Sequence, residues 1–428
     1  MIGITSILIF FILLLLRTPV SVAIGTAGFW GIFLSKYPLK MLILIMQDIV
    51  ENINYLPIIF FILVGHIANA TKLSERMFDF ATSAVGHFKG GLAHANILAS
   101  MIFAGVSGSG IADCAGLGII EIKAMTDRGY DLDFSAAVSI ASSIVGPIIP
   151  PSITLVIYAL LANVSVGKML VAGLIPGIFI GISMMILVFY LSASGRVYAP
   201  TAPKQSLKTQ YSCFKRNFTA LLAPLILLSG FFLGVISPSE SGAFAIFYII
   251  VIALFRRDAT LKEILRKGFG PSLLATAQIM FILCTASAFC WVLTREQIYL
   301  NIGELIINLT RGNKYLFWLL VNLFYLVNGC FIPGIATMVI TIPIWAPLLP
   351  IFNIDPVQFG VVIIFNDMIG MLTPPVGSGI FIMMSISKVK YEKLIRSAVP
   401  FIIELYLALI ILILFPIITT FLPNLLFK

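Results

Sequence analysis

The sequence predicts an all-α polytopic membrane protein made of two inverted repeats, each holding a re-entrant helical hairpin and a helix broken by a Pro-Pro pair. Hydrophobic residues make up 60% of the chain and charged residues 11%, against about 45–50% and 25% in soluble domains. A membrane-spanning helix needs about 20 apolar residues, so the chain has room for roughly a dozen crossing or re-entrant elements. The helix breaks, the charge distribution and an internal repeat supply the rest of the prediction.

Two apolar segments of membrane length are each interrupted by adjacent prolines, the first within Gly146–Thr154 and the second within Gly370–Ser378. Proline removes a backbone donor and clashes with the carbonyl four residues earlier, so neither segment can be one continuous helix. In lipid such breaks are tolerated only inside protein or beside a water-filled cavity. A matched pair of interrupted apolar segments indicates the binding site of a secondary transporter.

The basic residues are distributed unevenly, which orients the chain in a membrane. The two strongest clusters, Gly195–Asn217 and Arg256–Gly270, are separated by the apolar segments Phe218–Ile236 and Gly242–Phe255. Two crossings return the chain to the same face, so both clusters are predicted to be cytoplasmic and both termini periplasmic. The net charge of +9 therefore indicates orientation, and no nucleic-acid partner is expected. The same topology places inside Arg17, residues 71–94, the Glu121–Phe134 loop and residues 387–397.

An internal repeat organises the chain. Ile58–Leu63 has a counterpart in Ile279–Leu283, and each is followed by an amphipathic connection, a Gly-punctuated hairpin, a loop and a broken segment. The predicted topology makes the halves run in opposite directions, as inverted repeats that support alternating access do. Chance similarity among apolar segments is the alternative. The expected divisions are scaffold helices with an interfacial arm (1–54), repeat 1 (55–194, hairpin about 95–120, broken helix 135–163), cytoplasmic basic loops with central scaffold helices (195–270), repeat 2 (271–397, hairpin about 316–350, broken helix 360–387) and a C-terminal helix (398–428).

The first predicted hairpin has its highest density of small and polar residues between Gly105 and Gly110. Small residues let the backbone turn sharply there and leave carbonyls and the Ser107 and Ser109 hydroxyls free to face a cation. Sodium, a hard cation like calcium, favours such oxygen ligands, and half-helix N-termini at the same break favour a substrate carboxylate. Ser142 and Ser143 could complete the cation cage from the opposite arm. The alternative is a helix-packing interface of small residues.

Two acidic residues lie inside apolar segments. Asp113 is one helical turn from Ser109, and Asp367 lies six residues before Thr373. An intramembrane carboxylate is costly unless it is paired or faces water, so each is a functional candidate. Each could equally satisfy backbone amides of its own segment.

An enzyme is a remote alternative, because Gly105-Val106-Ser107-Gly108 matches the Gly-x-Ser-Gly pattern of rhomboid-type intramembrane serine proteases. Such a serine needs a histidine within hydrogen-bond reach. The three histidines, His66, His87 and His94, all precede it, whereas rhomboids supply theirs from a later helix. No Gly-x-x-x-x-Gly-Lys-Ser/Thr run is present, so an ion gradient rather than ATP is the expected energy source.

Motifs covering nearly the whole chain resemble, in combination, the large (DctM-like) membrane subunit of tripartite ATP-independent periplasmic (TRAP) transporters. The resemblance implies a sodium-coupled transporter of the elevator architecture of the ion-transporter superfamily, in the bacterial inner membrane. Its mobile domain would move two re-entrant hairpins against a scaffold. The motifs are Gly65, Val85–His87, Gly90–Leu92, Gly105–Gly118, Arg128–Tyr130, Gly146–Tyr158, Ala172–Gly177 and Gly370–Gly377.

The resemblance also implies partners. A periplasmic substrate-binding protein (DctP-like) would deliver an organic acid, such as a C4-dicarboxylate, sialic acid or another sugar or keto acid. A small four-helix membrane subunit (DctQ-like) would brace the scaffold, and because no extension precedes Met1 it is expected as a separate chain. No cofactor is expected beyond Na⁺ as the coupling ion.

Carried onto this sequence, the resemblance assigns a site to residues of both halves. One departure weakens the assignment at the second hairpin, where the family often has an acidic residue and this chain has Pro333. The alternative is a stand-alone sodium/dicarboxylate carrier with the same hairpins and no binding protein. The implied sodium ligands are Ser107, Ser109, Ser143, Gly146, Pro147, Gly329, Thr337, Gly370, Thr373 and Pro375. The implied substrate-binding residues are Ser107, Gly108, Ser109, Asp113, Ser152, Thr373, Gly377 and Ser378.

Overall fold

The structure is a computed structural model that describes residues 2–201, 206–232 and 236–427. Lys204 and Lys428, and residues 233–235 of the Phe218–Ile236 segment, contributed to the predicted topology and lie outside these described residues. All regular secondary structure within the described residues is helical, as the sequence predicts.

The helices of the N-terminal half begin with three at the N-terminus and continue to a long apolar helix before the first basic cluster. They are α1 (Ile2–Leu15), α2 (Val20–Leu34), α3 (Lys40–Glu51), a 3₁₀ turn (Ile53–Tyr55), α4 (Leu56–Ala70), α5 (Leu73–Val85), α6 (Gly91–Ser107), α7 (Gly110–Thr126), α8 (Leu132–Ser143), α9 (Ile153–Leu161), α10 (Val166–Ala172) and α11 (Leu174–Ala193).

The helices of the C-terminal half begin with the pair between the basic clusters. They are α12 (Leu207–Phe232), α13 (Pro238–Phe255), α14 (Leu261–Glu263), a π-helical turn (Ile264–Phe269), α15 (Gly270–Arg295), α16 (Ile298–Thr310), α17 (Lys314–Phe331), α18 (Gly334–Trp345), a 3₁₀ turn (Ala346–Leu348), α19 (Pro356–Leu372), α20 (Ser378–Ser387), α21 (Tyr391–Leu414) and α22 (Ile417–Leu426).

Six helical segments are long and apolar enough to cross a membrane, and several shorter apolar helices accompany them. Together they make a multi-pass membrane protein, because helices satisfy their backbone hydrogen bonds internally and are stable in lipid. The six segments are Ile53–Ala70, Val166–Ala193, Pro238–Phe255, Leu261–Arg295, Lys314–Phe331 and Tyr391–Leu414.

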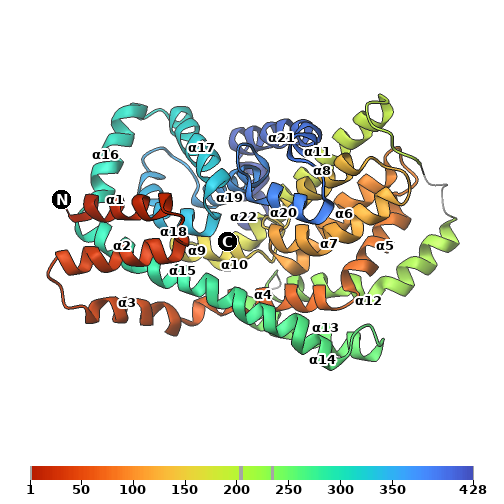
Figure 1. The fold of residues 1–428 in the computed structure, drawn as a ribbon, viewed down its shortest axis with the longest axis horizontal. Helices are drawn as coiled ribbons and strands as arrows, with labels where there is room; N and C mark the ends of the chain where they lie inside the picture. The colour runs from red at the N-terminus through yellow and green to blue at the C-terminus, as the bar shows by residue number, and fades with distance from the viewer. Residues whose placement is uncertain (1, 202–205, 233–235, 428) are drawn as a thin grey trace.

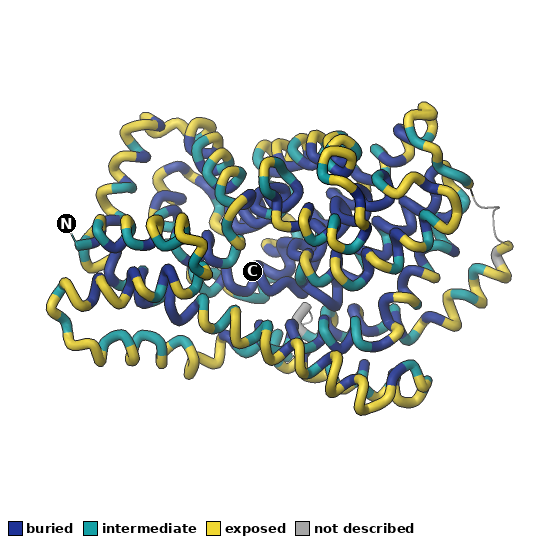
Figure 2. Tube along the Cα trace, viewed as in Figure 1, coloured by how far each residue is buried: buried dark blue, intermediate teal, exposed yellow. Residues whose placement is uncertain are grey.

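The helices form an outer layer and an inner core. In the outer layer α15 packs against α2 and α3, α1 packs against α2, and α13 packs against α4 and α12. In Figure 1 α2, α3, α13 and α15 lie in the left and lower part, and α12 lies at the lower right. In the core α8 packs against α6, α7 and α21, while α19 packs against α17 and α21. Figure 2 shows that buried residues concentrate in the middle of the molecule, whereas α3 has no buried residue.

The chain leaves helical geometry at both Pro-Pro pairs. The first break separates α8 from α9 and spans residues 144–152, and the second separates α19 from α20 and spans residues 373–377. Two helical hairpins accompany the breaks: α6 turns into α7 at Gly108–Ser109, and α17 turns into α18 at Ile332–Pro333. The Pro150–Pro151 and Pro374–Pro375 peptide bonds are cis.

The predicted loop over Glu121–Phe134 is wrong in its first part, because α7 continues through Thr126. Glu121 lies on the same helical face as Asp113, two turns away, and is 1% exposed. Ser100 Oγ donates to Glu121 Oε1 at 3.4 Å. Hydroxyl groups of α6 and α8 interact with this acid inside the helical core.

Candidate functional site

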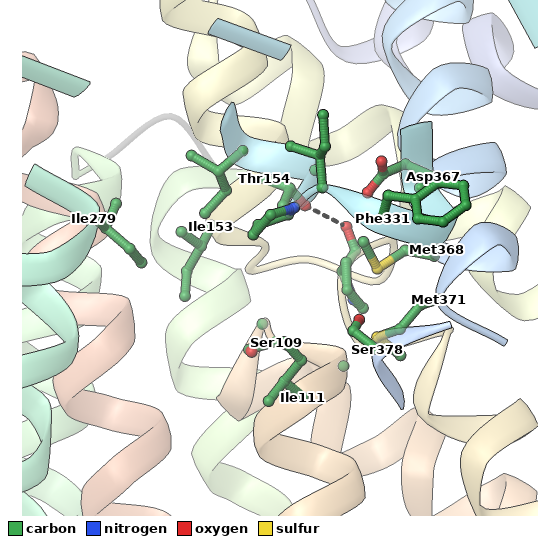
Figure 3. Close-up of a pocket in the computed structure, with 18 residues that line it drawn as sticks. Ser109, Ile111, Ile153, Thr154, Ile279, Phe331, Asp367, Met368, Met371 and Ser378 are labelled. Atoms are coloured by element: carbon green, nitrogen blue, oxygen red, sulfur yellow. Dashed lines mark hydrogen bonds between the residues drawn. The ribbon is translucent and has the colours of Figure 1, made fainter. Parts of the chain in front are cut away.

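A cavity of about 250 Å³ lies between the two hairpins and the two helix breaks (Figure 3). Both halves of the chain line it. Of the predicted site residues, the wall contains Gly108, Ser109, Pro147, Gly329 and Ser378. The remaining predicted site residues lie outside the wall.

Four helices begin at the cavity. The wall includes the first residue of each, namely Gly110 of α7, Ile153 of α9, Gly334 of α18 and Ser378 of α20. The first N–H groups of a helix lack intrahelical partners, and its N-terminus carries about half a positive charge. The cavity is therefore surrounded by positive helix ends, although no described residue of its wall is Lys, Arg or His.

Serine hydroxyls cap two of these four helix starts. Ser109 Oγ accepts from Ala112 N at 3.4 Å at the start of α7, and Ser152 Oγ accepts from Leu155 N at 3.2 Å at the start of α9. Thr154 Oγ1 donates to the Pro147 carbonyl at 3.1 Å (dashed in Figure 3). The Ser152 and Thr154 bonds fix the break loop against α9, which follows it.

Oxygen atoms gather behind the tip of the first hairpin. Ser107 Oγ donates to Asp113 Oδ1, while Asp113 Oδ2 is buried and has no hydrogen-bond partner. A Cβ atom on Gly146 would lie 2.5 Å from Asp113 Oδ2 and 3.2 Å from the Ser143 carbonyl oxygen. Four predicted site residues therefore lie together between the first hairpin and the first break, namely Ser107, Asp113, Ser143 and Gly146. The Asp113 Oδ2 atom lies among them without a hydrogen-bond partner. Asp113 itself lies outside the cavity wall.

The second hairpin is tied to the second break by backbone contacts. Gly377 N donates to the Cys330 carbonyl at 3.2 Å, and a Cβ atom on Gly370 would lie 2.8 Å from Gly329 Cα. Thr337 Oγ1 is buried without a partner.

Two other predicted residues of this half make local bonds. Thr373 Oγ1 donates to the Ile369 carbonyl at 2.7 Å. The Pro375 carbonyl accepts from Tyr391 OH at 2.7 Å. Both groups stabilise the loop that lies between α19 and α20.

Asp367 lines the cavity on the side of the second hairpin (Figure 3). The residue is 4% exposed, and its Oδ1 atom is buried without a partner. Its Oδ2 atom lies so close to the start of α18 that a Cβ atom on Gly334 would be 1.8 Å away. A carboxylate thus reaches the second hairpin tip from α19, whereas Pro333 occupies the tip itself.

Most of the remaining wall is apolar and was not predicted. A wall residue of this kind has the same side chain as one that faces lipid, so the sequence carries no signal that separates them. The sequence analysis did not include the polar wall residue Thr154 among the site residues. Its position two residues after Ser152, which caps α9, was a feature of the sequence that could have indicated it. The apolar wall residues are Ile111, Ile153, Ile279, Phe331, Ile332, Ile335, Met368 and Met371.

The protease-like Gly-x-Ser-Gly pattern has no histidine base. Within the described residues, Ser107 bonds to Asp113 and has no hydrogen bond to a histidine. His94 lies thirteen residues earlier on α6, about 20 Å away at 1.5 Å per residue. The His94 ring is buried and lies 3.1 Å from the Lys89 carbonyl.

Comparisons with known proteins agree with the geometry. The family profile described as "Tripartite ATP-independent periplasmic transporter, DctM component" matches residues 7–418. The sialic acid TRAP transporter large permease protein SiaM of Vibrio cholerae is 36% identical over 380 residues, covering 88% of this chain and 87% of that protein. The C4-dicarboxylate TRAP transporter large permease protein DctM of Pseudomonas aeruginosa is 34% identical over 404 residues, covering 94% of each.

A solved structure shares the fold at low sequence identity. The YdaH transporter of Alcanivorax borkumensis superposes with a TM-score of 0.61 and 15% identity, covering 84% of each chain. The likeness concerns the arrangement of helices alone.

Proposed function

This chain belongs to the DctM-component family of tripartite ATP-independent periplasmic transporters, whose members are transport subunits and not enzymes, and we propose that it couples a sodium gradient to the uptake of an organic acid. The acid is delivered by a periplasmic binding protein, and a separate small membrane subunit braces the scaffold. The two relatives described above are named for sialic acid and for C4-dicarboxylates, both of which are organic acids.

The convergence of four helix starts on one cavity carries the proposal. A carboxylate binds there through backbone N–H groups and the positive helix ends, as anions do at other helix N-termini. The hydroxyls of Ser109 and Ser378 add donors within the same wall. Broken helices whose N-termini face an anionic substrate are a recurring arrangement in secondary transporters.

The oxygen cluster behind the first hairpin supports the sodium site. The ends of α6 and α8 bring Ser107 Oγ, the Ser143 carbonyl and the unpartnered Asp113 Oδ2 together. A buried carboxylate without a partner is costly, and a bound cation with oxygen coordination relieves this cost. We place one sodium ion here, and a second among the predicted residues Gly329, Thr337, Gly370, Thr373 and Pro375.

The layered fold supports an elevator cycle. Both hairpins and both broken helices lie in the core, and the outer layer of α1–α4, α12, α13 and α15 packs along one side of it. In the proposed cycle the core carries the site across the inner membrane while the outer layer stays in place. Both chain termini are periplasmic in this orientation.

Reconstituted uptake tests the proposal. Proteoliposomes hold this chain with its small subunit, the binding protein is added outside, and an inward sodium gradient drives uptake of labelled sialic acid, succinate and gluconate. Uptake that requires both sodium and the binding protein is expected. Sodium-driven uptake without the binding protein would identify a stand-alone carrier, and uptake of no acid under any gradient would contradict the proposed function.

The sodium site gives a separate prediction for Asp113→Asn. Removing the charge leaves the cation with weaker ligands, so the sodium concentration for half-maximal uptake should rise about tenfold or more, since charged hydrogen-bond partners contribute about 1.5–3 kcal/mol. The measurement is the uptake rate against sodium concentration. Glu304→Gln, the same change at an exposed residue of α16, is the control, and an equal sodium dependence in both variants would remove Asp113 from the site.

A further inference from the structure

Asp367 makes the cavity asymmetric in charge. Of the four helix starts that line it, those of α7, α9 and α20 face the cavity with the hydroxyls of Ser109, Thr154 and Ser378 beside them. The start of α18 instead has the Asp367 carboxylate against its first residue, Gly334. The protein's own carboxylate therefore offsets the positive end of α18, and one side of the cavity lacks the anion-attracting character of the rest.

The Asp367 carboxylate can accept further hydrogen bonds. Its Oδ1 atom has no hydrogen-bond partner, and no Lys, Arg or His is among the described residues of the cavity wall. The neighbouring wall residues Phe331, Ile332 and Met368 are apolar and offer no side-chain donor. A ligand group that reaches this side must therefore donate hydrogen bonds or carry positive charge, because an acceptor or an anion there would be repelled.

We propose that the transported acid is a monocarboxylate whose far end carries hydroxyl or ammonium donors, bound with its carboxylate toward α7, α9 and α20 and its donors toward Asp367. Dicarboxylates are rejected because their second carboxylate would lie against Asp367. This inference rests on the proposed function and narrows its substrate class. It also fixes the direction in which the substrate lies in the cavity.

Matched pairs of acids test the inference in the reconstituted transporter with its partners. Gluconate and glucarate share a carbon skeleton and differ at the far end, as do 4-aminobutyrate and succinate. Each is tested, alongside sialic acid, for direct uptake and as a competitor of whichever acid is taken up. The wild-type chain is expected to transport a donor-bearing monocarboxylate and to prefer it at least tenfold over its dicarboxylate counterpart.

Substitution of Asp367 separates charge from structure. In Asp367→Asn the apparent affinity for the transported acid should fall about 10- to 100-fold, since hydrogen bonds to charged groups are the stronger ones, and the preference over the matched dicarboxylate should disappear. Asp367→Glu keeps the charge and should keep the preference at a lower rate. Glu304→Gln is the matched surface control. Thermal unfolding and size-exclusion profiles establish that each variant is folded.

The outcomes are distinguishable. Transport of a dicarboxylate by the wild-type chain overturns the inference and leaves the proposed function standing. An Asp367→Asn variant with unchanged selectivity and an altered sodium dependence also overturns it, and assigns the carboxylate to a cation instead. Absence of all uptake contradicts the proposed function itself.

Discussion

Gly108→Val is expected to abolish uptake and to lower the stability of the first hairpin. Gly108 adopts a φ of +60° at the turn between α6 and α7, a conformation that costs a residue with a side chain about 1–2 kcal/mol. A Cβ atom there would also lie 2.4 Å from the Pro151 carbonyl oxygen. Because that oxygen belongs to backbone, the hairpin tip would have to move away from the break, which would open the cavity wall and separate the proposed cation ligands.

The control for Gly108→Val is Gly195→Val. Gly195 has a φ of +70° and nothing within 4 Å of its Cβ position, so the substitution introduces the same backbone strain without the clash. Uptake in proteoliposomes and thermal unfolding in detergent are measured for both. Uptake by Gly108→Val that matches Gly195→Val would mean that the hairpin tip does not need its close contact with the break.

Gly370→Val should have a similarly large effect in the second half. The Cβ position of Gly370 lies 2.8 Å from Gly329 Cα, so α17 and α19 touch through backbone atoms that no side-chain rotation can move. Overpacking typically costs about 1–3 kcal/mol, and here it would also displace Asp367, three residues away on the same helix. A lower midpoint of thermal unfolding and loss of uptake are expected.

Two further variants test the cause of that effect. Gly270→Val places the same side chain at a helix start whose Cβ position is 3.9 Å from the Leu265 carbonyl oxygen, and should unfold near the wild-type temperature. Gly329→Val should lower the stability about as much as Gly370→Val. The double variant should lose less stability than the two single variants together, because either substitution alone already separates α17 from α19. A stability loss in the double variant equal to the sum of the two single losses would show that the two glycines act independently.

The positions of the hairpins and breaks follow from the sequence because their causes are local. Proline cannot continue a helix, and the small residues between Gly105 and Gly110 permit a tight turn, so the sequence locates both features of the first half. The same reasoning identified Ser109, which caps α7 at the cavity. Ser378, the first residue of α20 at the cavity, was instead implied by the family resemblance.

The cavity wall depends on tertiary packing and could not be predicted in the same way. Phe331 and Met371 line the cavity, but apolar side chains also cover the lipid-facing surface, and composition does not distinguish the two. The position of Asp367 against the start of α18 depends on how α19 packs against the second hairpin, where Gly370 of α19 meets Gly329 of α17. Glu121 was assigned to a loop because its burial depends on partners from α6 and α8.

The helix starts around the cavity have a consequence for how selectivity can change. In the proposed binding mode peptide groups supply the attraction for a carboxylate, and their chemistry is the same whatever residues occupy those positions. Point mutations therefore retain the capacity to hold an anion as long as the backbone path is kept. Exchanges between apolar residues at wall positions such as Ile111, Phe331 or Met371 alter size and shape alone. Such a scaffold can acquire new substrates through substitution of apolar wall side chains, while the proposed recognition of acids by the backbone stays the same.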